Sequence, residues 1–268
     1  MSPNANAPIG IFDSGIGGLT VFAAVRKLLP HESIIYLGDT ARVPYGTKSA
    51  ETVVRYAREC ADFLMERKVK AIVVACNTAS AYALPHLADS FDVPVLGVVE
   101  PGCEAALEIT KKRAVGVIGT AGTIASNAYG SLLKSKDPNV RVVSRACPLF
   151  VPLVEEGWVD NDVTSASAER YLKGLREEGI DALILGCTHY PLLTKTIAKH
   201  MGDAIKLVDS AEATACALEK LLSEKGLVAK QGNMPKHHLY VTDLPARFET
   251  IAHKFLKGDL PQVSRVDL

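Results

Sequence analysis

Residues 70–78 read Lys-Ala-Ile-Val-Val-Ala-Cys-Asn-Thr, and residues 181–189 read Asp-Ala-Leu-Ile-Leu-Gly-Cys-Thr-His. Each stretch is an apolar run of strand length that ends in a cysteine, Cys76 or Cys187, and then turns polar. Such a run, without alternation of polar and apolar residues, is typical of a strand buried in a parallel sheet. The two stretches therefore predict an α/β fold in which two strands each end at a cysteine.

Two further matches between the halves of the chain keep the same order and nearly the same separation. Residues 9–15 (Ile-Gly-Ile-Phe-Asp-Ser-Gly) match residues 115–121 (Val-Gly-Val-Ile-Gly-Thr-Ala), and residues 42–44 (Arg-Val-Pro) match residues 150–152 (Phe-Val-Pro). Ordered matches of this kind indicate an internal duplication. We expect two similar parallel-sheet α/β domains related by pseudo-two-fold symmetry, with the active site in the cleft between them.

Runs rich in valine and isoleucine alternate with segments of helical length, which is typical of a parallel sheet covered on both faces. We expect strands at residues 9–12, 33–37, 71–75, 95–98, 114–118, 140–144, 182–185, 206–208 and 238–241. We expect helices at residues 19–29, 50–67, 79–90, 105–112, 123–134, 165–178, 192–200, 211–225 and 244–256. Pro101 and Gly102 read as a turn between the domains. We therefore assign residues 1–99 and 210–268 to the first domain and residues 100–209 to the second.

The composition excludes several classes of protein. The 268 residues are 48% apolar and 22% charged, which suits one or two folded cores and excludes a disordered or fibrous chain. Thirty Lys and Arg balance thirty Asp and Glu without blocks of like charge, so we expect neither a nucleic acid nor a membrane as partner. No apolar run approaches the roughly 20 residues that span a bilayer. Residues 1–8 lack the features of a secretory signal, so we expect a cytoplasmic enzyme acting on a small molecule.

The cysteine spacing gives no sign of a metal site or a disulfide framework. Zinc ribbons, iron–sulfur runs and redox dithiols need closely spaced pairs, and no Cys-x-x-Cys occurs here. His237 and His238 have no partner ligands nearby in the sequence. We expect no metal and six free thiols, at positions 60, 76, 103, 147, 187 and 216.

Cys76 and Cys187 differ from the other cysteines because polar residues follow them at the carboxyl end of a strand, where α/β sheets bind ligands. A helix N-terminus at that place can bind a carboxylate and favour a thiolate. The alternative is that a cysteine is a small buried apolar side chain, which we expect for the remaining four.

Two equivalent cysteines that face one cleft have a specific chemical use. One thiolate can remove a proton from a stereocentre held between them, and the other thiol can return a proton to the opposite face. This is racemisation by two bases. A cysteine hydrolase needs one nucleophile, one activating histidine and an oxyanion hole, and has no use for a second equivalent thiol. A two-domain protein that closes on an amino acid without chemistry is a further alternative.

Residues 13–18 (Asp-Ser-Gly-Ile-Gly-Gly) follow the first strand and lead into a helix, so the backbone amides and Ser14 can hold an anionic group. The segment is not a dinucleotide loop, because Thr20 stands where the last glycine would be, and it lacks the Gly-Lys-Ser/Thr of a P-loop. An amino acid therefore fits better than a nucleotide. Asp13 can hold the substrate ammonium or polarise a cysteine, or alternatively cap the helix.

Four more residues are candidates for the cleft. Tyr45 and Gly46 follow the second strand, although Pro and Gly there are also typical of a plain turn. Glu155 occupies the comparable place in the second half, where a pair of acids is otherwise typical of a solvated face. His189 can orient or protonate a group beside Cys187, although a lone histidine is more often a core residue.

Read in order, these motifs resemble the glutamate racemases of the aspartate/glutamate racemase superfamily. The resemblance covers about residues 9–226 and rests on residues 13–18, 43–46, 75–80, 154–157 and 186–192. It implies a cofactor-independent isomerase, often a homodimer, that interconverts L- and D-glutamate and supplies D-glutamate for peptidoglycan and cell shape. A racemase acting on aspartate or a hydantoin is the nearest alternative. The run Cys187-Thr188-His189 favours glutamate, because aspartate racemases usually resemble Cys-Thr-Glu there.

The resemblance also implies roles for individual residues. Cys76 corresponds to the base that acts on D-glutamate and Cys187 to the base that acts on L-glutamate. The assisting catalytic residues correspond to Asp13, Asp39, Glu155 and His189. The substrate-binding positions correspond to Asp13, Ser14, Tyr45, Gly46, Asn77, Thr78, Thr120, Thr123 and Thr188. Residues 231–268 carry no motif of the family.

Overall fold

The apolar runs assemble into two separate parallel sheets in the computed structural model, which describes residues 4–230, 232–256 and 260–268. Residues 1–3 of the N-terminal stretch 1–8 lie outside the described residues. The first sheet has the order β10 (Val263–Arg265), β9 (His237–Val241), β2 (Ile34–Gly38), β1 (Ile9–Asp13), β3 (Ala71–Val74) and β4 (Val95–Gly97). The second has the order β6 (Arg141–Ala146), β5 (Ala114–Gly119), β7 (Ala182–Gly186) and β8 (Lys206–Asp209).

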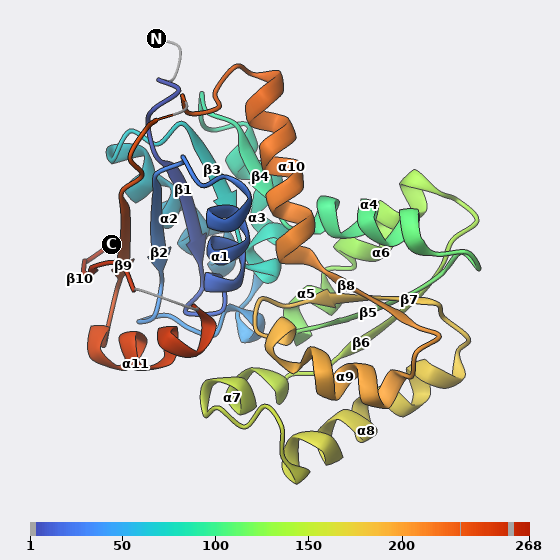
Figure 1. Ribbon diagram of the computed structural model, residues 1–268. Coiled ribbons are helices and arrows are strands. Elements are labelled where there is room, and N and C mark those ends of the chain that lie inside the picture. The colour runs from blue at the N-terminus through green and yellow to red at the C-terminus, as the bar shows by residue number, and fades with distance from the viewer. Residues whose placement is uncertain (1–3, 231, 257–259) are drawn as a thin grey trace.

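The two sheets repeat one strand order. The strands β4-β3-β1-β2 of the first sheet correspond to β8-β7-β5-β6 of the second, so β1 matches β5 and β3 matches β7. These are the strands whose sequences match. Neighbouring strands in the described part of both sheets pair in parallel. The predicted fold class, two similar parallel-sheet α/β domains, is confirmed, and Figure 1 shows the two domains side by side.

Helices cover both faces of each sheet because the central strands are apolar on both sides. On the first sheet, one core includes α1 (Leu19–Leu28), α10 (Ser210–Glu224) and α11 (Pro245–Phe255), and the other includes α2 (Ala50–Glu66) and α3 (Asn77–Ala88). On the second sheet, one core includes α4 (Val99–Ile109) and α6 (Ala128–Lys136), and the other includes α7 (Phe150–Glu155), α8 (Asp162–Glu177) and α9 (Thr194–Met201). The remaining described helical elements are α5 (Ala121–Ala125) and the 3₁₀ turns η1 (Tyr45–Thr47) and η2 (Tyr190–Leu193).

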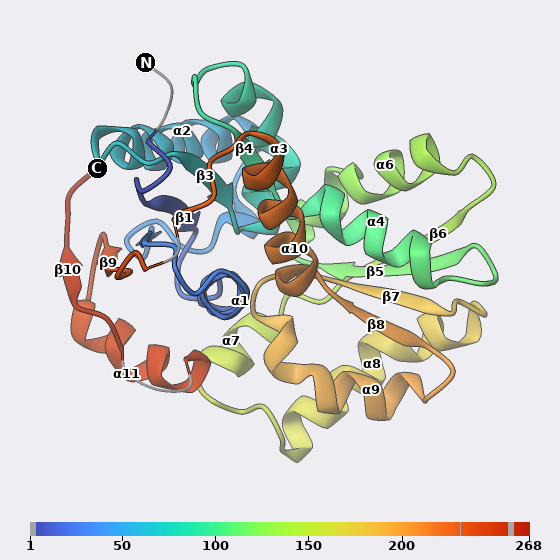
Figure 2. The same ribbon diagram turned by 45° about the horizontal axis from the view of Figure 1, so that its top comes forward.

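Helix α10 connects the two domains. It follows β8 of the second sheet, packs along α1 of the first domain and also touches α4 of the second. Figure 2 shows it running over the junction between the sheets. Its buried residues Ala211, Ala215, Leu218 and Leu222 lie in the same apolar core as β1. The chain then pairs β9 with β2 and β10 with β9 at the edge of the first sheet.

Two expected features are wrong. Pro101 and Gly102 do not form a turn, because α4 begins at Val99 and includes both. A proline is tolerated in the first turn of a helix, where its missing N–H would have no partner within the helix. The expected helix over residues 123–134 is two helices, because Asn127 adopts a left-handed φ of 52° between α5 and α6. Asparagine tolerates that conformation better than most residues do.

Candidate active site

Cys76 and Cys187 line one cavity at the carboxyl ends of the two sheets. Cys76 lies just beyond β3 and caps α3, where its Sγ accepts the N–H of Ala79 at 3.5 Å. Cys187 directly follows β7, at the equivalent place in the second domain. Each is 5% exposed, and the cavity between them has a volume of about 30 Å³. The structure thus brings together the two cysteines that the duplication relates.

Most of the predicted substrate-binding residues line the same cavity. They are Ser14, Tyr45, Gly46, Asn77, Thr78, Thr120 and Thr188, and His189 lines it as well. Four predicted residues are not among the described lining residues, although each contacts a residue that lines the cavity: Asp13, Asp39, Thr123 and Glu155. The polar groups that face the cavity come from both domains, so a small molecule held there would touch both.

The surroundings of Cys76 keep its proton on the sulfur. Burial and the nearby charge of Asp13 raise the pKa of Cys76 to about 12, although the N–H of Ala79 and the hydroxyl of Ser14 act in the opposite direction. The thiol lies 3.6 Å from Ser14 Oγ. Cys76 is therefore a neutral thiol at ordinary pH and can donate a proton.

A histidine lies beside Cys187. His189 Nδ1 lies 3.9 Å from Cys187 Sγ, and His189 Nε2 lies 3.1 Å from Glu155 Oε1 at the end of α7. Burial alone lowers the pKa of His189, but the hydrogen bonds to Cys187 and Glu155 and the charges of Cys187 and Asp13 together raise it to about 10. An imidazolium therefore stands beside one sulfur, whereas a carboxyl group stands near the other.

Asp13 joins the two domains behind the cavity. It ends β1, is fully buried, and accepts the N–H of Gly15 at 2.9 Å and the hydroxyl of Thr188 at 3.3 Å. Burial raises its pKa, whereas the charge of His189 and the amides of Gly15 and Gly18 lower it. The alternative role as a helix cap is wrong, because the N-cap of α1 is Gly18 without a side-chain cap. Asp13 instead fixes the loop after β1 against Thr188.

Asp39 supports Tyr45 from behind. Its Oδ2 accepts the Tyr45 hydroxyl at 2.5 Å and Arg42 Nε at 2.6 Å, and its Oδ1 accepts the Thr242 hydroxyl at 3.0 Å. Burial raises the pKa of Tyr45, so that hydroxyl keeps its proton and donates. The structure therefore places Asp39 one residue away from the cavity.

Three threonine hydroxyls join the domains on the opposite side. The Oγ1 atoms lie 2.9 Å apart for Thr78 and Thr120, 3.1 Å for Thr78 and Thr123, and 3.0 Å for Thr120 and Thr123. Thr78 follows Cys76 in the first domain, whereas Thr120 caps α5 in the second. Gly46 approaches this cluster so closely that a Cβ atom there would lie 2.6 Å from the Thr120 Cβ. Only glycine leaves room for the approach.

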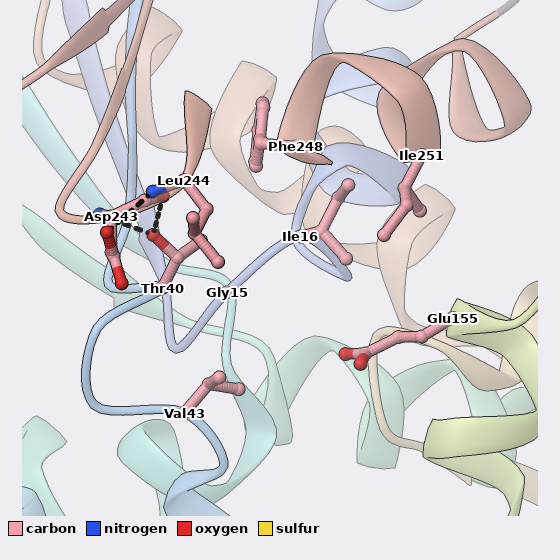
Figure 3. Close-up of a pocket in the computed structure, with 9 residues that line it drawn as sticks. All are labelled: Gly15, Ile16, Thr40, Val43, Glu155, Asp243, Leu244, Phe248 and Ile251. Atoms are coloured by element: carbon pink, nitrogen blue, oxygen red, sulfur yellow. Dashed lines mark hydrogen bonds between the residues drawn. The ribbon is translucent and has the colours of Figure 1, made fainter. Parts of the chain in front are cut away.

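A second cavity lies on the other side of the loop after β1. Figure 3 shows that Gly15, Ile16 and Glu155 meet Phe248 and Ile251 of α11 around it. Its volume is about 120 Å³. The Glu155 carboxylate points into this space in Figure 3, and the side chain is 25% exposed. Glu155 thus lines this second cavity and contacts His189, which lines the cysteine cavity.

Sequence reasoning also missed two residues that contact the lining residues Asn77 and His189. Tyr129 donates its hydroxyl to Asn77 Oδ1 at 2.6 Å. The ring of Phe255 lies edge-on to the His189 ring, with the centroids 6.1 Å apart. Neither residue belongs to a motif, because each contact joins segments far apart in the chain. Only the assembled fold reveals them.

Within the described residues, we find no helix with the length and apolar character of a membrane span. In the same part of the chain, no three His, Cys, Asp or Glu side chains meet in a way that suits a metal ion.

Comparison with known proteins decides the family. Residues 20–218 match the sequence profile of the Asp/Glu/Hydantoin racemase family. The chain belongs to this family. The glutamate racemase of Geobacter metallireducens is 54% identical over 260 residues, which are 97% of this chain and 96% of that protein. The predicted membership among the glutamate racemases is confirmed, and the protein is a racemase.

Solved structures of glutamate racemases share the fold over nearly their full length. An isoform from Bacillus anthracis is 43% identical, with a TM-score of 0.96 and coverage of 99% of both chains. The glutamate racemase of Francisella tularensis, solved in complex with D-glutamate, is 41% identical, with a TM-score of 0.92 and coverage of 98% of both chains. The two-domain arrangement of this racemase is therefore that of the family.

Proposed function

We propose that this racemase interconverts L- and D-glutamate without a cofactor, with Cys76 and Cys187 as the two bases. The observation that carries the proposal is that the two equivalent cysteines line one cavity. The substrate is supported by relatives named glutamate racemase and by the neighbour solved with D-glutamate.

In this mechanism, Cys187 removes the α-proton of L-glutamate while the imidazolium of His189 stabilises the negative charge on its sulfur. The C–H bond breaks, an S–H bond forms, and the electron pair stays on the α-carbon. The thiol of Cys76 then donates its proton to the opposite face, which gives D-glutamate. The reverse reaction uses the same two groups in exchanged roles. Conversion of L- to D-glutamate needs a thiolate at Cys187 and a thiol at Cys76. The imidazolium beside Cys187 favours the thiolate, and the raised pKa of Cys76 favours the thiol.

The carbanion needs stabilisation, because a thiol of ordinary pKa about 8.5 is a weak base for an amino-acid α-carbon. Burial from water and hydrogen-bond donors aimed at the substrate carboxylate supply it. We assign this task to the polar lining residues Ser14, Asn77, Thr78 and Thr188. Tyr45, Gly46 and Thr120 shape the cavity, and Asp13, Asp39, Thr123 and Glu155 hold the residues that line it.

The wider setting of the reaction follows from the resemblance. We propose that the enzyme works in the cytoplasm as a homodimer and that its D-glutamate enters peptidoglycan. The names of the relatives support the substrate that this setting requires.

Serine at either cysteine position tests the proposal. We expect Cys76→Ser and Cys187→Ser each to lower kcat/KM for L-glutamate by about 10²–10⁴, the usual share of a general acid or base. Circular dichroism of the glutamate solution follows the loss of optical activity. The matched control is Cys216→Ser, because Cys216 is exposed and lies outside the cavity.

Each alternative gives a different result. A cysteine hydrolase would leave one of the two cysteines dispensable. Turnover of L-aspartate as fast as of L-glutamate would overturn the assigned substrate. A binding protein would racemise no amino acid at all, and the two-thiol proposal would then be wrong.

A further inference from the structure

The side-chain amide of Asn77 is only half paired. Asn77 lines the cysteine cavity and is 2% exposed. Its Oδ1 accepts the Tyr129 hydroxyl at 2.6 Å, whereas its buried Nδ2 has no hydrogen-bond partner among the described residues. A buried N–H group without a partner costs free energy, so native proteins rarely keep one without a reason. The free NH₂ group is a donor held ready for an acceptor on a ligand.

Tyr129 is held in one position by its packing, and its hydroxyl orients the Asn77 side-chain amide. It lies in the first turn of α6, in the second domain, and is 2% exposed. Gly186 and Gly102 lie against its ring, and Gly186 leaves room for it. A Cβ atom at Gly186 would lie 3.2 Å from Tyr129 Cε2, and one at Gly102 would lie 3.4 Å from Cε1. A ring packed this closely cannot turn its hydroxyl away from Asn77.

The hydroxyl proton of Tyr129 determines which end of the amide faces it. Burial raises the pKa of Tyr129 well above its ordinary value, so the hydroxyl keeps its proton. Among the described residues, Asn77 Oδ1 is its only hydrogen-bond acceptor. The amide oxygen therefore faces Tyr129, and the NH₂ group faces the other way.

We propose that Tyr129 is a positioning residue that holds the Asn77 amide with its NH₂ group toward a carboxylate oxygen of the amino-acid substrate. This inference rests on the proposed function and adds a residue to it. Asn77 follows Cys76 in the first domain, whereas Tyr129 belongs to the second, so the amide is oriented only while the two domains are in contact. Substrate recognition beside one catalytic thiol thus depends on the other domain.

Tyr129→Phe tests the proposal, because it removes the hydroxyl and keeps the ring between the two glycines. We expect KM for L-glutamate to rise about tenfold, which is the range for one hydrogen bond, with kcat changed less than about twofold. The matched control is Tyr82→Phe. Its hydroxyl also crosses between the domains, to Gly122 O at 2.9 Å, but does not touch Asn77, so KM should stay within about twofold of wild type.

A double variant separates positioning from a structural effect. In Asn77→Ala, the group that Tyr129 orients is gone, so adding Tyr129→Phe should change KM no further. Additive effects of the two substitutions would overturn the proposal, because independent structural losses add. An unchanged KM in Tyr129→Phe would also overturn it, while racemisation by the wild type would leave the proposed function standing. A wild type that does not racemise glutamate would overturn both.

A second variant tests the proposal if Tyr129→Phe fails to fold, which a loss of its far-ultraviolet circular dichroism would show. Asn77→Asp retains an oxygen to accept the Tyr129 hydroxyl but replaces the NH₂ group with a negative oxygen. We expect KM to rise by more than about tenfold, because a donor to a carboxylate becomes a like charge. An unchanged KM would overturn the proposal.

Discussion

His189 connects the charges of the site. It contacts Cys187 on one side and Glu155 on the other, and Asp13 adds to the field that keeps it protonated. Because His189 is only 3% exposed, these three neighbours largely set the charge of its ring. The same arrangement places a cation beside the base that we assign to L-glutamate.

The titration of His189 tests this arrangement of charges directly. Since the charged form is stabilised, its pKa of about 10 means that the proton is retained through neutral pH and lost only as the pH rises through 10. Removing the Glu155 carboxylate removes one of the groups that raise this pKa. We expect Glu155→Gln to lower the pKa of His189 and to reduce kcat/KM for glutamate. NMR of protein labelled at histidine nitrogens measures the titration. A His189 that titrates near 6.5 in the wild type would contradict this account.

The sequence predicted which residues lie near the cavity. It did not predict the hydrogen-bond partners of their side chains. Cys76, Cys187 and Ser14 were expected there because each follows a strand at its carboxyl end, and the structure puts them there. Asp39 also follows a strand and Glu155 ends helix α7, but their carboxylates turn toward Tyr45 and His189. Side-chain direction depends on packing partners from other segments, which no single segment of sequence specifies.

One buried ion pair, between Lys70 and Glu32, holds three segments of the first domain together. Lys70 Nζ, just before β3, donates to Glu32 Oε2 at 2.5 Å, to Leu227 O at 2.7 Å and to Ala5 O. Glu32 Oε1 accepts the N–H of Ala229 at 2.8 Å. Burial lowers the pKa of Lys70, although Glu32 opposes the change. The pair therefore holds the segments before β1 and after α10 against β3.

Breaking this pair should destabilise the protein without touching the cavity. We expect Lys70→Met to lower the free energy of unfolding by about 3–5 kcal/mol, because Glu32 would remain as a buried charge without its partner. The double variant Lys70→Met/Glu32→Leu should recover part of that loss. Urea denaturation measures both. A Lys70→Met protein as stable as the wild type would show that the pair is not buried as described.

Helices and strands were predictable where the apolar pattern is long. They were less predictable where the conformation of a single residue sets an element boundary. The central strands follow from runs of Val and Ile, but β10 spans only Val263–Arg265 and is too short to show a pattern. The break between α5 and α6 depends on one left-handed residue, Asn127. Pro101 is a typical turn residue and also an acceptable first-turn residue, and its position relative to Val99 decides between the two.

At the scale of the whole molecule, three sets of contacts close the two domains around the cavity. Thr188 reaches Asp13, Tyr129 reaches Asn77, and Thr78 reaches Thr120 and Thr123. These contacts hold lining residues from both domains against the cysteine cavity. The division into residues 1–99 with 210–268 and residues 100–209 stays a prediction.

In the proposed mechanism, two thiols on opposite faces exchange protons with the α-carbon of glutamate. The most direct test is to incubate the protein with L-glutamate in deuterium oxide and to measure α-deuterium separately in each enantiomer at early times. Two bases predict that the D-glutamate formed carries solvent deuterium while the remaining L-glutamate keeps its α-hydrogen. Deuterium that appears equally fast in both enantiomers, or no exchange at all, would contradict the account.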